Sequence, residues 1–106
     1  MPRITNYELV SRIYSATDQD RIDWQATARP QEFTASFGGK WTLVLSTSSL
    51  NIVVLDVKDS EGETIVRITS REDERISDLH DMARRYALKI DKALADLLNE
   101  IDKPKN

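Results

Sequence analysis

The last third of the chain repeats apolar and polar residues with the period of an α-helix. On a helical wheel at about 100° per residue, its apolar positions from Leu79 to Ile101, apart from Leu88 and Ala95, fall within roughly 160° of arc. Their mean spacing of about 3.7 residues suits a straight helix on a core better than a two-stranded coiled coil. Because the stretch holds no interior Gly or Pro, the pattern predicts one long helix over about 73–103 that lies flat on a sheet.

A shorter amphipathic segment opens the chain. Thr5 and Glu8 have the spacing of a capping box, in which each residue satisfies a free backbone N–H at the start of a helix. The apolar residues that follow recur at helical spacing and predict a helix over about 6–17. The polar segment 18–23 comes next and predicts a turn.

The middle of the chain alternates apolar and polar residues with a period of two, which is typical of β-strands. Together with the turn residues between them, the alternating segments predict four strands, at about 33–37, 40–46, 51–59 and 64–69. Two hairpin loops fit the glycines after Phe37: a two-residue turn would pair Phe37 with Lys40, and a three-residue loop would pair Phe37 with Trp41. We favour the three-residue loop because it puts the apolar residues of both strands on one face.

These elements predict an α+β fold in a single domain, 1–106. It consists of an N-terminal helix, a four-stranded antiparallel meander and a long C-terminal helix packed on one sheet face. The opposite sheet face is half apolar, and Val44, Val54 and Ile65 are its candidate interface residues. The alternative is a solvated face whose β-branched residues reflect strand propensity alone.

Leu88 falls on the polar side of the predicted long helix, about 180° from the apolar stripe. A single exposed leucine is ordinary, and contact with a partner is the alternative, which makes Leu88 the fourth candidate interface residue. The same side carries a basic run, Arg84, Arg85, Lys89 and Lys92. Neighbouring aspartates neutralise most of this run, which favours a solvated, salt-bridged face over a nucleic-acid site.

The composition is that of a globular protein with a mild excess of acidic residues. Of the 106 residues, 31% are charged and 40% are hydrophobic, and the net charge is −3. The chain contains no cysteine, which excludes disulfides, thiolate metal sites and a cysteine nucleophile. There is no apolar run near about 18 residues and no signal-peptide pattern, so we expect a cytoplasmic protein.

Candidate catalytic and metal-binding residues are few. His80 is the single histidine, and no serine in a nucleophile-elbow sequence accompanies it. Asp18, Asp20 and Asp23 form an acidic loop, but the Gly and Glu that an EF-hand needs are missing at the matching positions. Phosphate-loop motifs are absent as well. We therefore expect no catalytic site, no cofactor and no metal.

The predicted order of helix, antiparallel sheet and alanine-rich helix resembles the topology of the double-stranded-RNA-binding domain. That family has a lysine cluster at the start of its second helix to meet phosphates, whereas the matching segment 71–78 is net acidic here. This departure disfavours RNA binding through that segment. RNA or DNA binding stays the alternative function, with the basic run Arg84, Arg85, Lys89 and Lys92 as the candidate contacts.

A second resemblance covers most of the chain. Ala16-Thr17, Trp24, Asp59-x-x-Gly62 and the segment 79–94 together resemble a short, uncharacterised bacterial helix–meander–helix family without known function. The resemblance implies a fold and no activity that can be transferred. Small size, acidic balance and missing catalytic motifs predict a non-catalytic protein-interaction or regulatory module, of the immunity or antitoxin type. We expect a protein partner or a homodimer, and no membrane.

Overall fold

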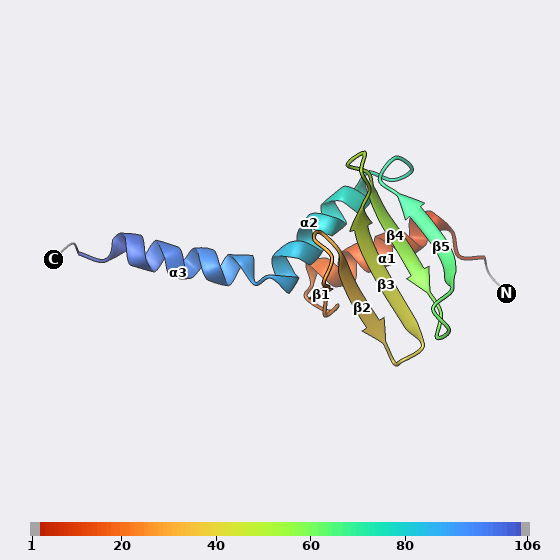
Figure 1. Cartoon of the computed structure of the whole chain (residues 1–106), viewed down its shortest axis with the longest axis horizontal. Coiled ribbons are helices and arrows are strands. Elements are labelled where there is room, and N and C mark those ends of the chain that lie inside the picture. The colour runs from red at the N-terminus through yellow and green to blue at the C-terminus, as the bar shows by residue number, and fades with distance from the viewer. Residues whose placement is uncertain (1–2, 105–106) are drawn as a thin grey trace.

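The computed structural model describes residues 3–104 and has an α+β fold with an N-terminal helix and an antiparallel sheet (Figure 1). Its elements, in chain order, are α1 (Asn6–Asp18), β1 (Gln25–Ala26), β2 (Phe33–Phe37), β3 (Trp41–Thr47), β4 (Val53–Lys58), β5 (Thr64–Thr69), α2 (Arg75–Ala87) and α3 (Ile90–Asp102). The predicted α+β class and the N-terminal helix are confirmed. The predictions of four strands and of one long C-terminal helix are wrong, since the sheet has five strands and that helix is divided in two.

The sheet is an antiparallel meander in the order β1-β2-β3-β4-β5. Phe37 on β2 pairs with Trp41 on β3, which confirms the three-residue loop between them. Gly38 and Gly39 in this loop have φ angles of 59° and 69°, a region that glycine enters without steric penalty. The register follows from burial, because it puts the apolar side chains of both strands on the same face.

The additional strand, β1, is only two residues long and pairs with the outer edge of β2, with Gln25 opposite Thr34. Two residues are too few to show an alternating pattern, so sequence periodicity does not reveal such a strand. It follows directly on Trp24, whose side chain is fully buried in the core. The short pairing therefore fixes the backbone directly after Trp24, whose side chain anchors the connector in the core.

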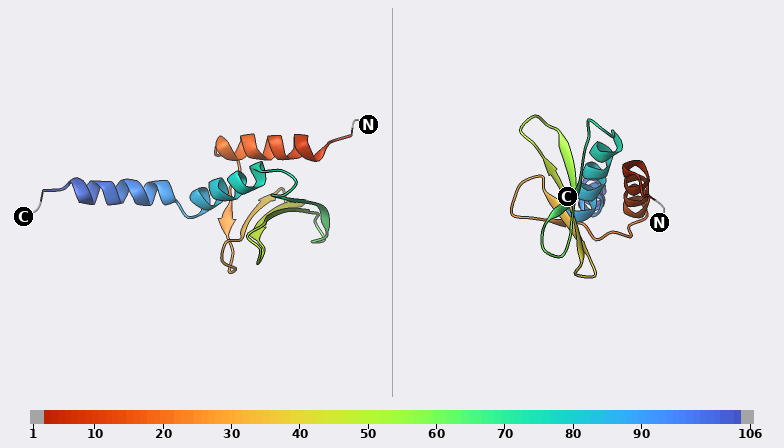
Figure 2. Two further views of the ribbon diagram at one scale, coloured as in Figure 1. Left: turned by 90° about the horizontal axis from the view of Figure 1, so that it is seen from above. Right: turned by 90° about the vertical axis from the view of Figure 1, so that its right-hand side faces the viewer.

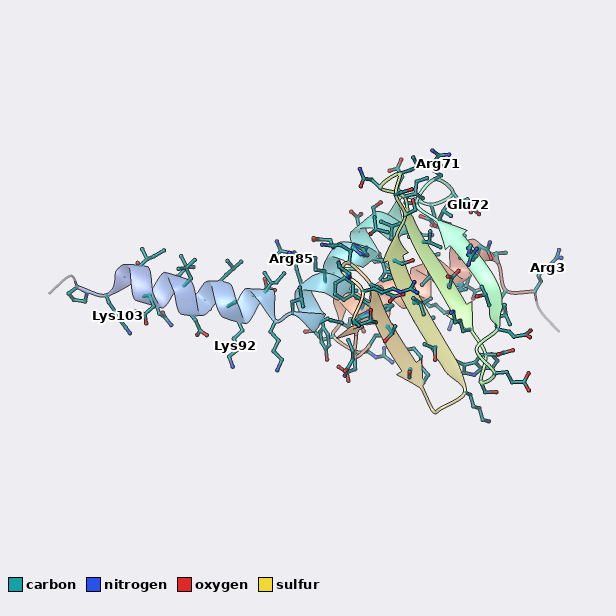
Figure 3. All side chains as sticks on the ribbon, viewed as in Figure 1. Arg3, Arg71, Glu72, Arg85, Lys92 and Lys103 are labelled. Atoms are coloured by element: carbon teal, nitrogen blue, oxygen red, sulfur yellow. The ribbon has the colours of Figure 1, made fainter. Side chains whose placement is uncertain are left out.

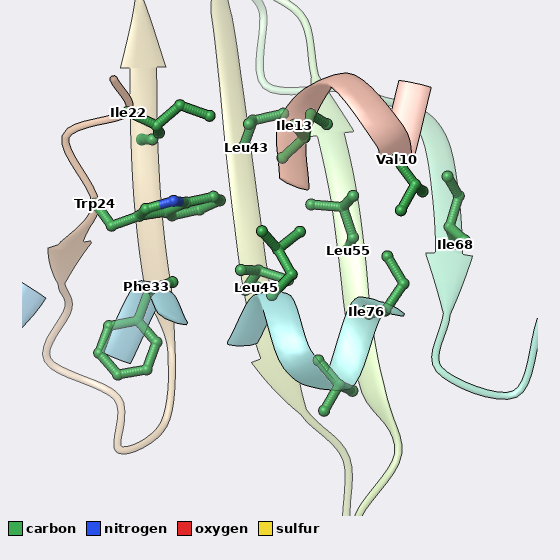
Figure 4. Packing of buried hydrophobic residues seen from close by; sticks show 14 of the residues in the cluster. Val10, Ile13, Ile22, Trp24, Phe33, Leu43, Leu45, Leu55, Ile68 and Ile76 are labelled. Atoms are coloured by element: carbon green, nitrogen blue, oxygen red, sulfur yellow. The ribbon is translucent and has the colours of Figure 1, made fainter. Parts of the chain in front are cut away.

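Both α1 and α2 lie on one face of the sheet (Figure 2). The core between these layers is formed by buried apolar residues of both helices, the connector and the strands: Val10, Ile13, Ile22, Trp24, Phe33, Ala35, Leu43, Leu45, Val53, Leu55, Val57, Ile68, Ile76, Leu79 and Ala83. Figure 4 shows the Trp24 ring reaching from the connector across β2 towards β3. The apolar stripe of the predicted long helix thus reaches the core only through its first half.

Two polar contacts fix the helices to the rest of the domain. The indole Nε1 of Trp24 donates a buried hydrogen bond of 3.0 Å to Oγ1 of Thr17 at the end of α1. At the start of α2, the Arg75 guanidinium donates to Oγ of Ser11 at 2.6 Å and lies over the Tyr7 ring at 4.3 Å. Each contact joins residues from different elements, so together they position α1 against the core.

The break in the predicted long helix falls at Leu88 and Lys89. Lys89 has φ 52° and ψ 44°, a left-handed conformation that ends the hydrogen-bonding pattern of α2 before α3 begins. The 13 residues of α2 span about 20 Å, which matches the length of a six-residue strand. Beyond Ala87 the sheet therefore offers nothing to pack on, and the chain leaves the domain.

Helix α3 projects away from the folded domain as a single arm (Figure 1). The molecule measures 66 × 32 × 25 Å, and this elongation comes from the arm. None of the residues Ile90–Asp102 is buried. Consequently α3 does not lie flat on the sheet as the sequence pattern predicts. No helix within residues 3–104 has both the length and the apolar character needed to cross a lipid bilayer.

Candidate interaction surface

Helix α3 carries a row of large apolar side chains, of which all but the half-buried Ile90 are exposed. The row consists of Ile90, Leu94, Leu97, Leu98 and Ile101, and we call it the α3 stripe. The exposed fraction is 46% for Leu94, 53% for Leu97, 57% for Leu98 and 65% for Ile101. At about 100° per residue these five positions fall within about 100° of arc, so they form one continuous face.

Acidic residues border the α3 stripe on both sides. On the same wheel, Asp91 and Asp102 lie about 20–40° beyond Leu98, and Glu100 lies about 60° beyond Leu97. Lys92 and Lys103 fall on the opposite side of the helix, and Figure 3 shows both along one edge of α3. The apolar face therefore has an acidic border, at which Arg85 and Lys103 form exposed pairs with Asp91 and Glu100.

The junction between α2 and α3 is spanned by Arg85. Its guanidinium lies 3.3 Å from the carboxylate of Asp81 on α2 and 3.0 Å from that of Asp91 on α3. All three side chains are about half exposed or more, so each pair contributes little to the free energy of folding. They bridge the last turns of α2 and the first turn of α3.

An open hollow of about 970 Å³ lies beside this junction, between the acidic loop after α1 and the residues around the break. Asp20 and Asp23 line it on one side, and Arg85 and Lys92 on the other. Partial burial, with added repulsion from Asp23 and Asp20, raises the pKa of Tyr86 on its wall. Within residues 3–104 there is no group of three or more acidic, histidine or cysteine side chains placed to hold a metal ion.

The candidate residues of the outer sheet face are only partly brought together. Val44 pairs with Asp56, which makes Val44 and Val54 diagonal neighbours on β3 and β4. Val54 pairs with Thr69 at the end of β5, whereas Ile65 lies near its start, at a β-bulge where β5 has one residue more than β4. Between Val54 and Ile65, Nε of Arg67 donates to Oδ1 of Asp56 at 2.7 Å. A charged pair thus interrupts the apolar patch that the sequence predicts.

Leu88 and the basic run lie at the helix break. Leu88 is 48% exposed and occupies the turn between α2 and α3. Of the basic run, Arg84 and Arg85 lie in the last turn of α2, Lys89 forms the left-handed break, and Lys92 lies in the first turn of α3. Arg85 is engaged by two aspartates, so the four cations do not form a continuous basic surface free of carboxylates.

His80 has a structural environment. Its Nε2 lies 2.8 Å from the backbone carbonyl oxygen of Gln31 and 3.5 Å from Oγ1 of Thr47. Its ring packs edge-on against Phe33, with 5.4 Å between ring centroids. The imidazole therefore bridges α2 to the start of β2 and the end of β3, and its described contacts include no carboxylate or serine that would form a catalytic pair.

Comparison of the chain with protein-family models, with curated proteins and with solved structures finds no match.

Proposed function

We propose that this protein is a non-catalytic interaction module that binds a protein partner through the α3 stripe. The folded domain around the sheet acts as the base, and α3 is the contact element. The observation that carries the proposal is a 13-residue helix without a buried residue, on which Leu94, Leu97, Leu98 and Ile101 are all exposed. An accessory or regulatory role in the cytoplasm, of the immunity or antitoxin type, agrees with the small size and the acidic balance of the chain.

The energetics of an isolated helix support a partner. A helix of about 13 residues is only marginally stable alone in water, because nucleation is costly and packing normally supplies its stability. Burying one large aliphatic side chain contributes about 1.5–3 kcal/mol. A partner that covers Leu94, Leu97 and Ile101 would therefore stabilise the helix and the complex together.

The charge of α3 favours a protein over a membrane or a nucleic acid. Between Ile90 and Asp102 there are four acidic residues and one lysine, which gives a net charge of −3. Helices that lie on membranes carry Lys and Arg on their polar face and are attracted to anionic lipids. Phosphate backbones likewise require positive charge. An acidic helix is repelled by both kinds of surface.

The proposal is tested by photo-crosslinking in the native host. A photoreactive phenylalanine analogue is placed at position 98 in the stripe and, as a matched control, at position 96 on the opposite side of the same helix. We expect a protein adduct from position 98 that is lost when Leu94→Gln and Leu97→Gln are added. Gln is as good a helix former as Leu, so this loss reports the apolar contact. Equal adducts from both positions, or none that depends on the stripe, would contradict the proposal.

A further inference from the structure

We infer that the partner of the α3 stripe presents an apolar groove bordered by lysine or arginine side chains. This inference rests on the function proposed above and specifies the chemistry of the partner. It is carried by the position of the charges around the stripe. Asp91 and Asp102 border one side and Glu100 the other, while the backbone positions of Lys92 and Lys103 lie on the opposite side of the helix.

The bordering carboxylates remain accessible to a partner. Asp91 is paired with Arg85 at 3.0 Å, and Glu100 with Lys103 at 2.8 Å. These acidic side chains are 82% and 68% exposed in their pairs, and pairs so exposed to water contribute little. A lysine or arginine at the edge of a groove can therefore replace or share either cation when the stripe is buried. Such complementary charges also speed the encounter of the two molecules.

A second copy of the chain fits this surface poorly. Antiparallel pairing of two α3 helices would match Ile90 with Ile101 and Leu94 with Leu97 of the second copy, because both pairs are centred on the same point of the helix. The same arrangement brings Asp91 within about 3 Å, measured along the axis, of the height of Asp102 of the second copy, on one side of the seam. The twofold axis repeats this approach of like charges, and like charges across an interface disfavour a pairing.

The size of the helix also favours a groove over a single second helix. At 13 residues α3 is about 20 Å long and about 10 Å wide, so contact along one side covers a few hundred Å² on each partner. Stable interfaces bury about 800 Å² on each partner. A groove that encloses both the stripe and its acidic borders covers more of α3, as in other complexes where an amphipathic helix lies in a groove.

The charge preference is tested with two fluorescein-labelled amphipathic helical peptides that share one apolar face. The cationic peptide carries lysine at its polar positions and the anionic peptide carries glutamate. Fluorescence anisotropy of each is measured against the full chain at low and physiological salt. We expect the cationic peptide to bind at least tenfold more tightly, with weaker binding at higher salt. The substitutions Leu94→Gln and Leu97→Gln together should reduce this affinity at least tenfold.

Two matched variants separate the border from general negative charge. Asp102→Asn removes a carboxylate beside the stripe, and Asp96→Asn removes one from the opposite side of the same helix. We expect a severalfold loss of affinity for the cationic peptide in the first variant and no comparable loss in the second. Equal losses would overturn the inference, because they would reflect net charge alone.

Light scattering of the full chain distinguishes a failure of this inference from a failure of the proposed function. Equal binding of both peptides, or a dimer that Leu94→Gln and Leu97→Gln dissociate, would overturn the basic-groove inference while the stripe remains an interaction surface. If the wild type stays monomeric and binds neither peptide in a way that depends on the stripe, both are overturned.

Discussion

The guanidinium of Arg85 lies 3.0 Å from the carboxylate of Asp91, and this pair spans the break between α2 and α3. The sequence distance of six residues is longer than one helical turn, so the contact depends on the change of direction at Leu88 and Lys89. Asp81 holds the other side of the same guanidinium at 3.3 Å. The bend itself comes from the left-handed backbone conformation of Lys89, which sets where the arm points.

Replacing Lys89 with glycine should stabilise the protein. Lys89 adopts φ 52°, where a side chain clashes with its own backbone and glycine does not. After allowance for the greater freedom of glycine in the unfolded chain, we expect the free energy of unfolding to rise by about 0.5–1 kcal/mol. Urea denaturation measures the change. Lys92→Gly, in the interior of α3, is the control and should reduce helix content in circular dichroism. A loss of stability in Lys89→Gly would mean that the helix continues through this residue.

Substitution of Leu79 should destabilise the protein strongly and substitution of Leu97 should not, although both lie on the same predicted apolar stripe. Leu79 is fully buried, so Leu79→Ala should lower the free energy of unfolding by about 2–5 kcal/mol. Leu97 is 53% exposed, so Leu97→Gln should change it by no more than about 0.5 kcal/mol. Urea denaturation of both variants provides the comparison. A loss of several kcal/mol in Leu97→Gln would show that α3 packs on the domain.

This contrast explains which parts of the molecule the sequence predicts well. The strand register at Phe37 and Trp41 is predictable because a shift by one residue would turn a whole apolar face to solvent. The helix at the N-terminus is predictable because Thr5 caps it, accepting a hydrogen bond of 3.1 Å from the backbone N–H of Glu8. In both cases a local rule and the core require the same structure.

The candidate site is less predictable for physical reasons. An apolar stripe has the same periodicity whether it faces the chain's own core or a partner, so the pattern alone assigns Leu94 and Leu97 to the core. The break at Lys89 is not signalled by Gly or Pro. The informative signal is length, because a helix predicted over about 73–103 extends well beyond strands of five to seven residues.

The hydrogen bond between Trp24 and Thr17 should contribute measurably to stability. Thr17→Val removes the acceptor while keeping the shape of the side chain, and it leaves the buried indole N–H of Trp24 without a partner. A buried polar group that loses its partner costs about 1–3 kcal/mol, which is the expected decrease in the free energy of unfolding. A double-mutant cycle with Trp24→Phe isolates the pair, because the second substitution should cost less once the first is present. Additive losses would indicate that packing alone explains both effects.

Asp73 should make the stability of the domain sensitive to acid. The hydrogen bonds from Arg75, the shortest of them 2.6 Å, hold the pKa of the Asp73 carboxyl below its ordinary value. The unfolded chain therefore binds a proton more readily than the folded one. The stabilising contribution is fully present above the ordinary pKa of an aspartate, near pH 4, and is lost as the pH falls through the lower pKa of the folded state.

The variant Asp73→Asn tests this dependence. Its free energy of unfolding should fall less steeply than that of the wild type between pH 5 and pH 3. The difference in slope corresponds to the proton that the Asp73 carboxylate takes up on unfolding. Thermal unfolding at several pH values measures both curves. Asp96→Asn is the control, because Asp96 is exposed on α3 and makes no described ion pair, and its curve should parallel the wild type. Parallel curves for Asp73→Asn and the wild type would contradict the assignment.

Nucleic-acid binding through Arg84, Arg85, Lys89 and Lys92 is the alternative function, and it has a direct test. Fluorescently labelled RNA and DNA are titrated with the full chain at about 50 mM and about 200 mM salt, since contacts to phosphate weaken steeply over this range. We expect no micromolar binding even at the lower concentration. The reason is the arrangement at the break, where Arg85 is paired with Asp81 and Asp91 and the helix that follows carries a net charge of −3 from four acids and one lysine. Salt-sensitive micromolar binding that disappears in Lys89→Gln and Lys92→Gln would instead assign the junction to nucleic acid and reject a protein partner as its main ligand.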